Sequence, residues 1–145
     1  MGVASNYEGW LGYAKMGSTA RLSGRSVLVV EDESLIAIGL KELFETEGAI
    51  VDLASTPHDA LRLVDEVVFS AAVLDFGSAG DDTAPLCRAL RACSIPFMYY
   101  TGYDDLDERS SGPPVLAKPA SAEALITTIA QLLNLPSQSN SAARY

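Results

Sequence analysis

Short, uninterrupted apolar runs alternate with segments of helical periodicity through most of the chain. The apolar runs are Val27–Val30, Ile50–Ala54, Ala71–Leu74, Ile95–Tyr100 and Pro114–Ala117. After each run, apolar side chains recur every three or four residues, as on one face of a helix. Parallel strands need long crossovers of this kind, and strands that are apolar throughout need both sheet faces covered. The pattern predicts an α/β fold, a doubly wound five-stranded parallel sheet with helices on both faces.

Helix start and stop signals place five helices between and after the strands. The first follows the acidic loop at Glu31 and ends at Gly48, the second begins at Thr56-Pro57, and the third opens at Thr83. A short, polar and acidic fourth helix is predicted near residues 104–109, and Ser121 is expected to cap the last one.

The length of 145 residues, with 48% hydrophobic side chains, allows one domain with a proper core. Residues 1–25 show no sustained period and are expected to form a flexible N-terminal extension. Residues 26–134 form the predicted domain, and the Ser- and Asn-rich residues 135–145 form a C-terminal tail. We expect a monomer or a weak dimer.

The charge and the cysteines limit the classes of function. A formal net charge of -9, with only ten Lys plus Arg, disfavours binding to nucleic acid or to an anionic membrane, and favours cationic ligands. No apolar run approaches the length of a membrane span. Cys87 and Cys93 do not have the spacing of metal ligands and no secretory signal precedes them, so a cytoplasmic setting is expected.

Polar residues stand where the predicted strands end: Glu31, Asp32, Asp75, Thr101 and Lys118. Ligands of a doubly wound sheet bind outside the carboxyl ends of its strands, so we expect these side chains to meet. Crowded carboxylates repel each other and are neutralised by a hard cation, for which Mg²⁺ is expected. Lys118 and Thr101 can hold phosphoryl oxygens. Asp75 can then act as a nucleophile that forms an acyl phosphate, although an Asp before a Gly-rich loop is also an ordinary turn residue.

Four motifs resemble those of a known family: Val29-Val30-Glu31-Asp32-Glu33, Val73-Leu74-Asp75, Tyr100-Thr101-Gly102 and Ala117-Lys118-Pro119. In this order, and each at a strand end, they resemble the receiver domain of two-component response regulators. The resemblance implies a flavodoxin-like fold with strand order 2-1-3-4-5. The resemblance covers about residues 26–133. It implies that Asp75 is the phosphoacceptor, that Asp32, Asp75 and the backbone carbonyl of Gly77 bind Mg²⁺, and that Glu31 holds a metal-bound water. It also implies that Thr101 and Lys118 contact the phosphoryl oxygens and that Lys118-Pro119 is a cis peptide.

The resemblance implies a stand-alone receiver that takes a phosphoryl group from a histidine kinase or a histidine phosphotransfer protein. Its output would be altered binding of a downstream protein, or removal of phosphate from the donor as a shuttle or sink. Such a domain promotes its own phosphorylation and dephosphorylation and is not a turnover enzyme. Tyr103, two residues beyond Thr101, is expected to cover part of the acyl phosphate.

One departure from the family pattern keeps a second interpretation open. The family often carries an aromatic residue three positions before the lysine, where it swings inward on phosphorylation, and this chain has Val115 there. The alternative is a degenerate receiver that acts as a phosphorylation-independent protein-interaction module.

Two other classes are disfavoured. An aspartate-nucleophile hydrolase of the haloacid dehalogenase kind needs a second acid two residues beyond the nucleophile, where this chain has Gly77. A mononucleotide binder needs a donor-rich loop where this chain has the acidic residues 31–33.

Overall fold

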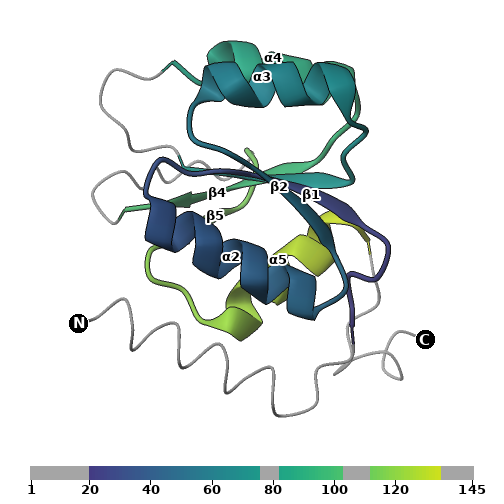
Figure 1. The fold of residues 1–145 in the computed structure, drawn as a ribbon, viewed down its shortest axis with the longest axis vertical. Coiled ribbons are helices and arrows are strands. Elements are labelled where there is room, and N and C mark those ends of the chain that lie inside the picture. The colour runs from purple at the N-terminus through teal and green to yellow at the C-terminus, as the bar shows by residue number, and fades with distance from the viewer. Residues whose placement is uncertain (1–19, 76–81, 103–111, 135–145) are drawn as a thin grey trace.

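The computed structural model describes residues 20–75, 82–102 and 112–134. Strands and helices alternate from Ser26 to Thr101, as the apolar runs predict (Figure 1). The elements are β1 (Ser26–Val30), α2 (Ser34–Thr46), β2 (Ile50–Ala54), α3 (Pro57–Glu66), β3 (Ala71–Leu74), α4 (Ala84–Ala92), β4 (Phe97–Thr101), β5 (Val115–Ala117) and α5 (Ala122–Leu132). The fourth helix predicted near residues 104–109 lies outside the described residues, and so does the C-terminal tail.

The five strands form one sheet of order β2-β1-β3-β4-β5, and every neighbouring pair is parallel. This confirms the predicted doubly wound sheet. The chain moves outward from β1 to one edge, returns to β3 on the other side of β1, and continues to β5. The strand order therefore reverses between β1 and β3, and ligands of such sheets bind at this reversal.

Helices cover both faces of the sheet, with α3 and α4 on one side and α2 and α5 on the other (Figure 1). The alternation of β1 shows how one strand serves both cores. Val27 and Val29 pack into the cluster with α2 and α5, whereas Leu28 and Val30 pack into the cluster with α3. All four are at most 4% exposed, which explains why this strand is apolar throughout.

Two of the predicted helix caps are present. The Thr56 hydroxyl accepts a hydrogen bond from the backbone N–H of Asp59 (3.0 Å), and the Ser121 hydroxyl accepts one from Ala124 (3.0 Å). Gly48, the predicted stop of the first helix, has φ +92°, and a Cβ there would lie 2.8 Å from the Ser23 Cα. Both observations account for a glycine at this turn.

The residues just before β1 pack against the domain. Leu22 is fully buried and its N–H donates to the Glu47 carbonyl (2.8 Å), while the Arg21 N–H donates to a Glu47 carboxylate oxygen (2.9 Å). Of the expected N-terminal extension 1–25, residues 1–19 lie outside the described residues. Among the helices that the structure describes, none has the length and apolar character needed to cross a bilayer.

Candidate phosphoryl-acceptor site

The backbone ladder fixes where the polar strand ends lie. The N–H of Asp75, one residue past β3, donates to the Val30 carbonyl (2.8 Å), and the N–H of Lys118, one residue past β5, donates to the Thr101 carbonyl (2.7 Å). Each bond continues the parallel ladder beyond the strand, so the side chains that follow the strands are held in register at the carboxyl edge of the sheet. The predicted convergence at this edge is observed.

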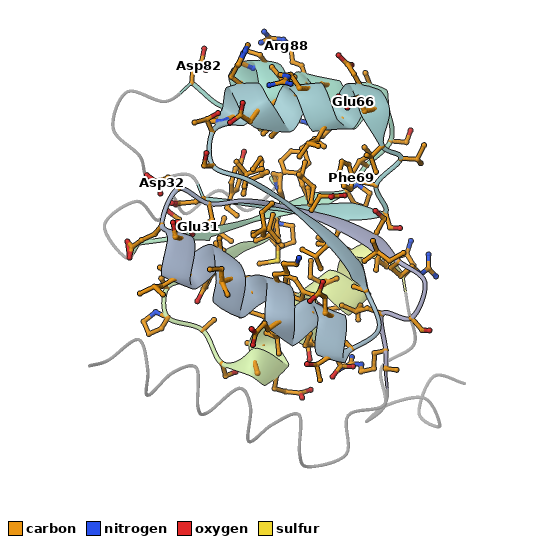
Figure 2. All side chains as sticks on the ribbon, viewed as in Figure 1. Glu31, Asp32, Glu66, Phe69, Asp82 and Arg88 are labelled. Atoms are coloured by element: carbon orange, nitrogen blue, oxygen red, sulfur yellow. The ribbon has the colours of Figure 1, made fainter. Side chains whose placement is uncertain are left out.

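Three carboxylates meet there. Glu31, Asp32 and Asp75 each offer an oxygen within 4.8 Å of the others, although they come from the ends of two different strands. Glu31 is buried, Asp32 is exposed, and Asp75 is partly buried. Figure 2 shows Glu31 and Asp32 at the loop that leads from β1 into α2. A set of oxygen ligands that is open on one side suits Mg²⁺, which keeps several of its waters. Gly77, the fourth predicted metal ligand, lies outside the described residues.

Lys118 brings a positive charge to this cluster. Its ammonium donates to Glu31 Oε1 at 2.7 Å and lies 3.4 Å from Asp75 Oδ2. Burial alone would lower the pKa of Lys118, but the hydrogen bond and charge of Glu31, together with Asp75, outweigh it and raise the pKa above its usual value. Lys118 is therefore held as an ammonium beside the Asp75 carboxylate.

Glu31 is a buried carboxyl group whose ionisation is disfavoured. Its burial raises the pKa from 4.5 to about 7, while the hydrogen bonds from Lys118 and from the Glu33 N–H (3.1 Å) act in the opposite direction. The nearby Asp75 carboxylate adds to the increase. A bound cation would favour the ionised form of Glu31 against the cost of its burial.

Thr101 contributes a hydroxyl that is buried and has no hydrogen-bond partner within the described part of the chain. A buried hydroxyl without a partner costs free energy, and most such groups in native proteins are satisfied. An oxygen-rich ligand at Asp75 would provide an acceptor. This is the kind of exception that marks a binding site.

Tyr100, which the sequence analysis names in the Tyr100-Thr101-Gly102 motif without giving it a role, is a neighbour of the site. Its hydroxyl accepts a hydrogen bond from the Ala120 N–H (3.2 Å), and the Lys118 ammonium lies 5.7 Å from its ring centroid. Burial raises the pKa of the Tyr100 hydroxyl. The alternation of side chains along β4 could have indicated that Tyr100 is buried in the core, because Tyr100 lies on the α5 side of the sheet together with Met98.

The segment after Lys118 also agrees with the family pattern. The Lys118-Pro119 peptide is cis, as predicted.

Val115, the residue that replaces the usual aromatic side chain, stands opposite Tyr99 in the register of β4 and β5 and is partly buried. Tyr103 lies outside the described residues, so its expected cover of the acceptor stays a prediction.

Comparisons with known proteins identify the family. The response regulator MprA of Mycolicibacterium vanbaalenii is 30% identical over 114 residues, covering 74% of this chain and 49% of that protein. The transcriptional regulatory protein BasR of Escherichia coli is also 30% identical over 114 residues, covering 74% and 51%. The chain thus spans about half the length of the curated relatives it matches. No family model matches the chain.

Comparison with solved structures indicates the same family. SdrG from Sphingomonas melonis is 35% identical, with a TM-score of 0.64 and coverage of 75% of this chain and 96% of that one. A response regulator receiver domain protein from Clostridium thermocellum is 26% identical, with a TM-score of 0.67 and coverage of 76% and 94%. The receiver domain of the sensor histidine kinase PA1611 from Pseudomonas aeruginosa, described with a magnesium ion in its active-site cleft, shares the fold at 21% identity, with a TM-score of 0.66 and coverage of 77% and 99%.

The same family is indicated by the parallel sheet, by the carboxylates at its switch point and by the similarity to these proteins. The chain belongs to the response regulator receiver domains of two-component systems.

Proposed function

We propose that this chain accepts a phosphoryl group on Asp75 from a phosphohistidine of a histidine kinase or a histidine phosphotransfer protein. In this reaction the Asp75 carboxylate oxygen forms a bond to phosphorus as the bond between phosphorus and the histidine nitrogen breaks. The product is an acyl phosphate on Asp75 and a free imidazole on the donor. Receiver domains are signalling domains, and this one would act by changing partner binding or by moving phosphate, in the cytoplasm and without catalytic turnover of a small substrate.

One observation carries the proposal. The Lys118 ammonium stands beside both Glu31 (2.7 Å) and Asp75 (3.4 Å), so a positive charge is already in place at the carboxylate that would receive the phosphoryl group. Phosphoryl transfer needs little else from a protein than positioning and stabilisation of charge on the equatorial oxygens. Lys118 would hold one of these oxygens, and the Thr101 hydroxyl, which has no partner among the described residues, would donate to another.

The carboxylates fit a divalent cation. Glu31, Asp32 and Asp75 would hold Mg²⁺, with Gly77 as the further ligand implied by the family and Glu31 acting through a metal-bound water. Bound Mg²⁺ would supply neutralisation of the negative charge that the phosphoryl group brings. The magnesium-bound PA1611 receiver domain supports this assignment.

Intact-mass spectrometry of the full chain with Mg²⁺ and acetyl phosphate tests the proposal. We expect an adduct with the mass of one phosphoryl group on the wild type and on Asp65→Ala, an exposed carboxylate on α3, but not on Asp75→Ala. An unmodified wild type, or an equal adduct on Asp75→Ala, would contradict the proposal. The former result would favour the degenerate receiver that acts without phosphorylation. Candidate kinases in place of acetyl phosphate would identify the donor.

A further inference from the structure

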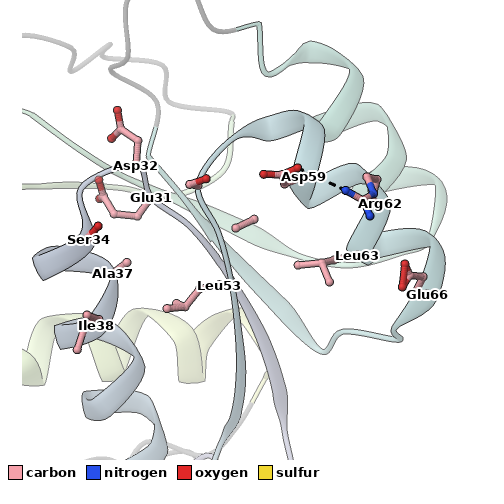
Figure 3. Close-up of a pocket in the computed structure, with 12 residues that line it drawn as sticks. Glu31, Asp32, Ser34, Ala37, Ile38, Leu53, Asp59, Arg62, Leu63 and Glu66 are labelled. Atoms are coloured by element: carbon pink, nitrogen blue, oxygen red, sulfur yellow. Dashed lines mark ion pairs between the residues drawn. The ribbon is translucent and has the colours of Figure 1, made fainter.

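A groove of about 590 Å³ lies next to the acceptor site, between α2 and α3 and beside the edge strand β2 (Figure 3). It begins at Glu31 and Asp32 and runs along one face of α3 as far as Glu66. Its volume falls in the range that is typical of ligand-binding pockets. The proposed phosphoryl transfer uses the carboxylates at one end and leaves the rest of the groove without a role.

The middle of the groove is apolar. Ile38 of α2, Leu53 of β2 and Leu63 of α3 all line it. Ile38 is 46% exposed and Leu53 is 37% exposed, so both expose apolar surface to solvent. Single exposed apolar residues are ordinary, but apolar side chains gathered in a groove with a polar rim are typical of interaction sites.

The ends of the groove are acidic. Asp59, Arg62 and Glu66 follow each other along α3 at a spacing that places them on one face, and all three line the groove. Arg62 is paired with Asp59 at 3.8 Å, as Figure 3 shows, whereas Glu66 makes no ion pair among the described residues. Glu31 and Asp32 supply the negative charge at the other end. Glu31 is already paired with Lys118 and Asp59 with Arg62, so Glu66 is the carboxylate of the groove that favours a cationic group on an occupant.

We propose that the groove between α2 and α3 docks a segment of a partner protein that carries apolar side chains flanked by Lys or Arg. The apolar side chains would cover Ile38, Leu53 and Leu63, and a basic one would meet Glu66. Such a segment matches the groove in both polarity and charge, as amphipathic segments do when they lie in apolar grooves. The docking does not depend on phosphoryl transfer.

Selection from a phage-displayed random dodecapeptide library on the immobilised full chain tests the proposal, followed by anisotropy titration of the enriched peptides. We expect the enriched peptides to combine apolar residues with Lys or Arg. Ile38→Ser and Glu66→Lys should each weaken binding about tenfold or more. Leu35→Ser, at a 60% exposed position on α2, and Asp65→Lys, on α3, are matched controls because neither residue lines the groove, and both should bind as the wild type does. Circular dichroism confirms that each variant is folded.

Three results would overturn the proposal: enriched peptides without basic residues, binding that Ile38→Ser and Glu66→Lys leave intact, and binding that the control variants weaken equally. A dimer of the chain alone that Ile38→Ser dissociates in light scattering would also overturn it, because a second copy would then occupy the groove. Asp75→Ala should bind the peptides as the wild type does. Peptide binding without an acyl phosphate would therefore contradict the proposed function and leave the docking site intact.

Discussion

The Lys118 ammonium lies closer to Glu31 (2.7 Å) than to the proposed acceptor Asp75 (3.4 Å). Glu31 has a side chain that is 2% exposed, so the pair is largely shielded from solvent and from screening by salt. A phosphoryl group on Asp75 would bring oxygens that compete with Glu31 for Lys118. The strength of the contact between Lys118 and Glu31 therefore bears on both the stability of the free protein and the rate of its phosphorylation.

Replacing Lys118 by Met keeps a long side chain near Tyr100 but removes the charge. A hydrogen bond to a charged group contributes roughly 1.5 to 3 kcal/mol, so we expect phosphorylation by acetyl phosphate to slow by about tenfold to a hundredfold. The time course of adduct formation by intact mass measures this rate. Lys41→Met is the control, because Lys41 is a partly exposed residue on α2 that pairs with Glu45 away from the site. Equal rates for the wild type and Lys118→Met would remove Lys118 from the reaction.

The raised pKa of Glu31 predicts how stability depends on pH without metal. The folded protein holds the Glu31 proton up to about pH 7, whereas the unfolded chain releases it near 4.5, so the folded state binds more protons between these values. Stability from this group therefore falls as pH rises through that window, by at most about 3 kcal/mol. The raised pKa of Lys118 adds no slope there, since its stabilisation is lost only at pH values above 10.5.

Glu31→Gln isolates this contribution, because glutamine resembles the protonated acid and keeps an acceptor for Lys118. In the presence of a chelator, the free energy of unfolding measured with urea should be similar for the wild type and Glu31→Gln at pH 5. At pH 8 it should be higher for Glu31→Gln than for the wild type. A difference that is constant across this range would show that Glu31 is ionised in the folded protein throughout.

Magnesium should stabilise the chain through the three carboxylates. A ligand that binds only the folded state adds about 2.7 kcal/mol at a concentration a hundredfold above its dissociation constant. We expect the midpoint temperature of thermal unfolding to rise with added MgCl₂ and to return to its original value with EDTA. Asp32→Asn should abolish the shift, while Asp65→Asn, also exposed but on α3, should retain it. A shift of equal size in Asp32→Asn would place the ion elsewhere.

The sheet could be predicted from the sequence because its strands are buried on both faces. Ala71 to Leu74 are each at most 1% exposed, and such a run has few structural options other than a central parallel strand. The site followed from the same logic, since each strand end delivers its next residue to one edge. Glu31, Asp32, Asp75, Thr101 and Lys118 lie at that edge in the structure, as expected.

What the sequence did not reveal depends on geometry between elements. The contact between Tyr100 and Ala120 joins β4 to the segment before α5, and no local pattern specifies which hydroxyl meets which N–H. The groove could not be predicted from the sequence either, because Ile38, Leu53 and Leu63 belong to three elements whose separation is set by packing rather than by sequence spacing. Periodicity identifies the face of a helix, but the space between two faces appears only in the fold.

Thr101 allows a test that separates a structural role from a functional one. Its hydroxyl is buried and without a partner among the described residues, so Thr101→Val should remove an unsatisfied polar group and raise the free energy of unfolding by about 1 kcal/mol in the unphosphorylated protein. The same change should slow phosphorylation, since the donor to the phosphoryl oxygen is lost. Thr101→Ser keeps the hydroxyl and removes a buried methyl group, so it should lower stability by about 1 kcal/mol yet retain the phosphorylation rate.

Thr101→Val should therefore raise stability while it slows phosphorylation, and Thr101→Ser should lower stability while it leaves the rate unchanged. A purely structural residue would not separate the two quantities in this way, because its changes would affect the rate only through folding. Urea unfolding in chelator and the intact-mass time course with Mg²⁺ measure the two quantities on the same preparations. If Thr101→Val were less stable than the wild type, the hydroxyl would already have a partner in the free protein, and its assignment as a donor kept for the phosphoryl group would be wrong.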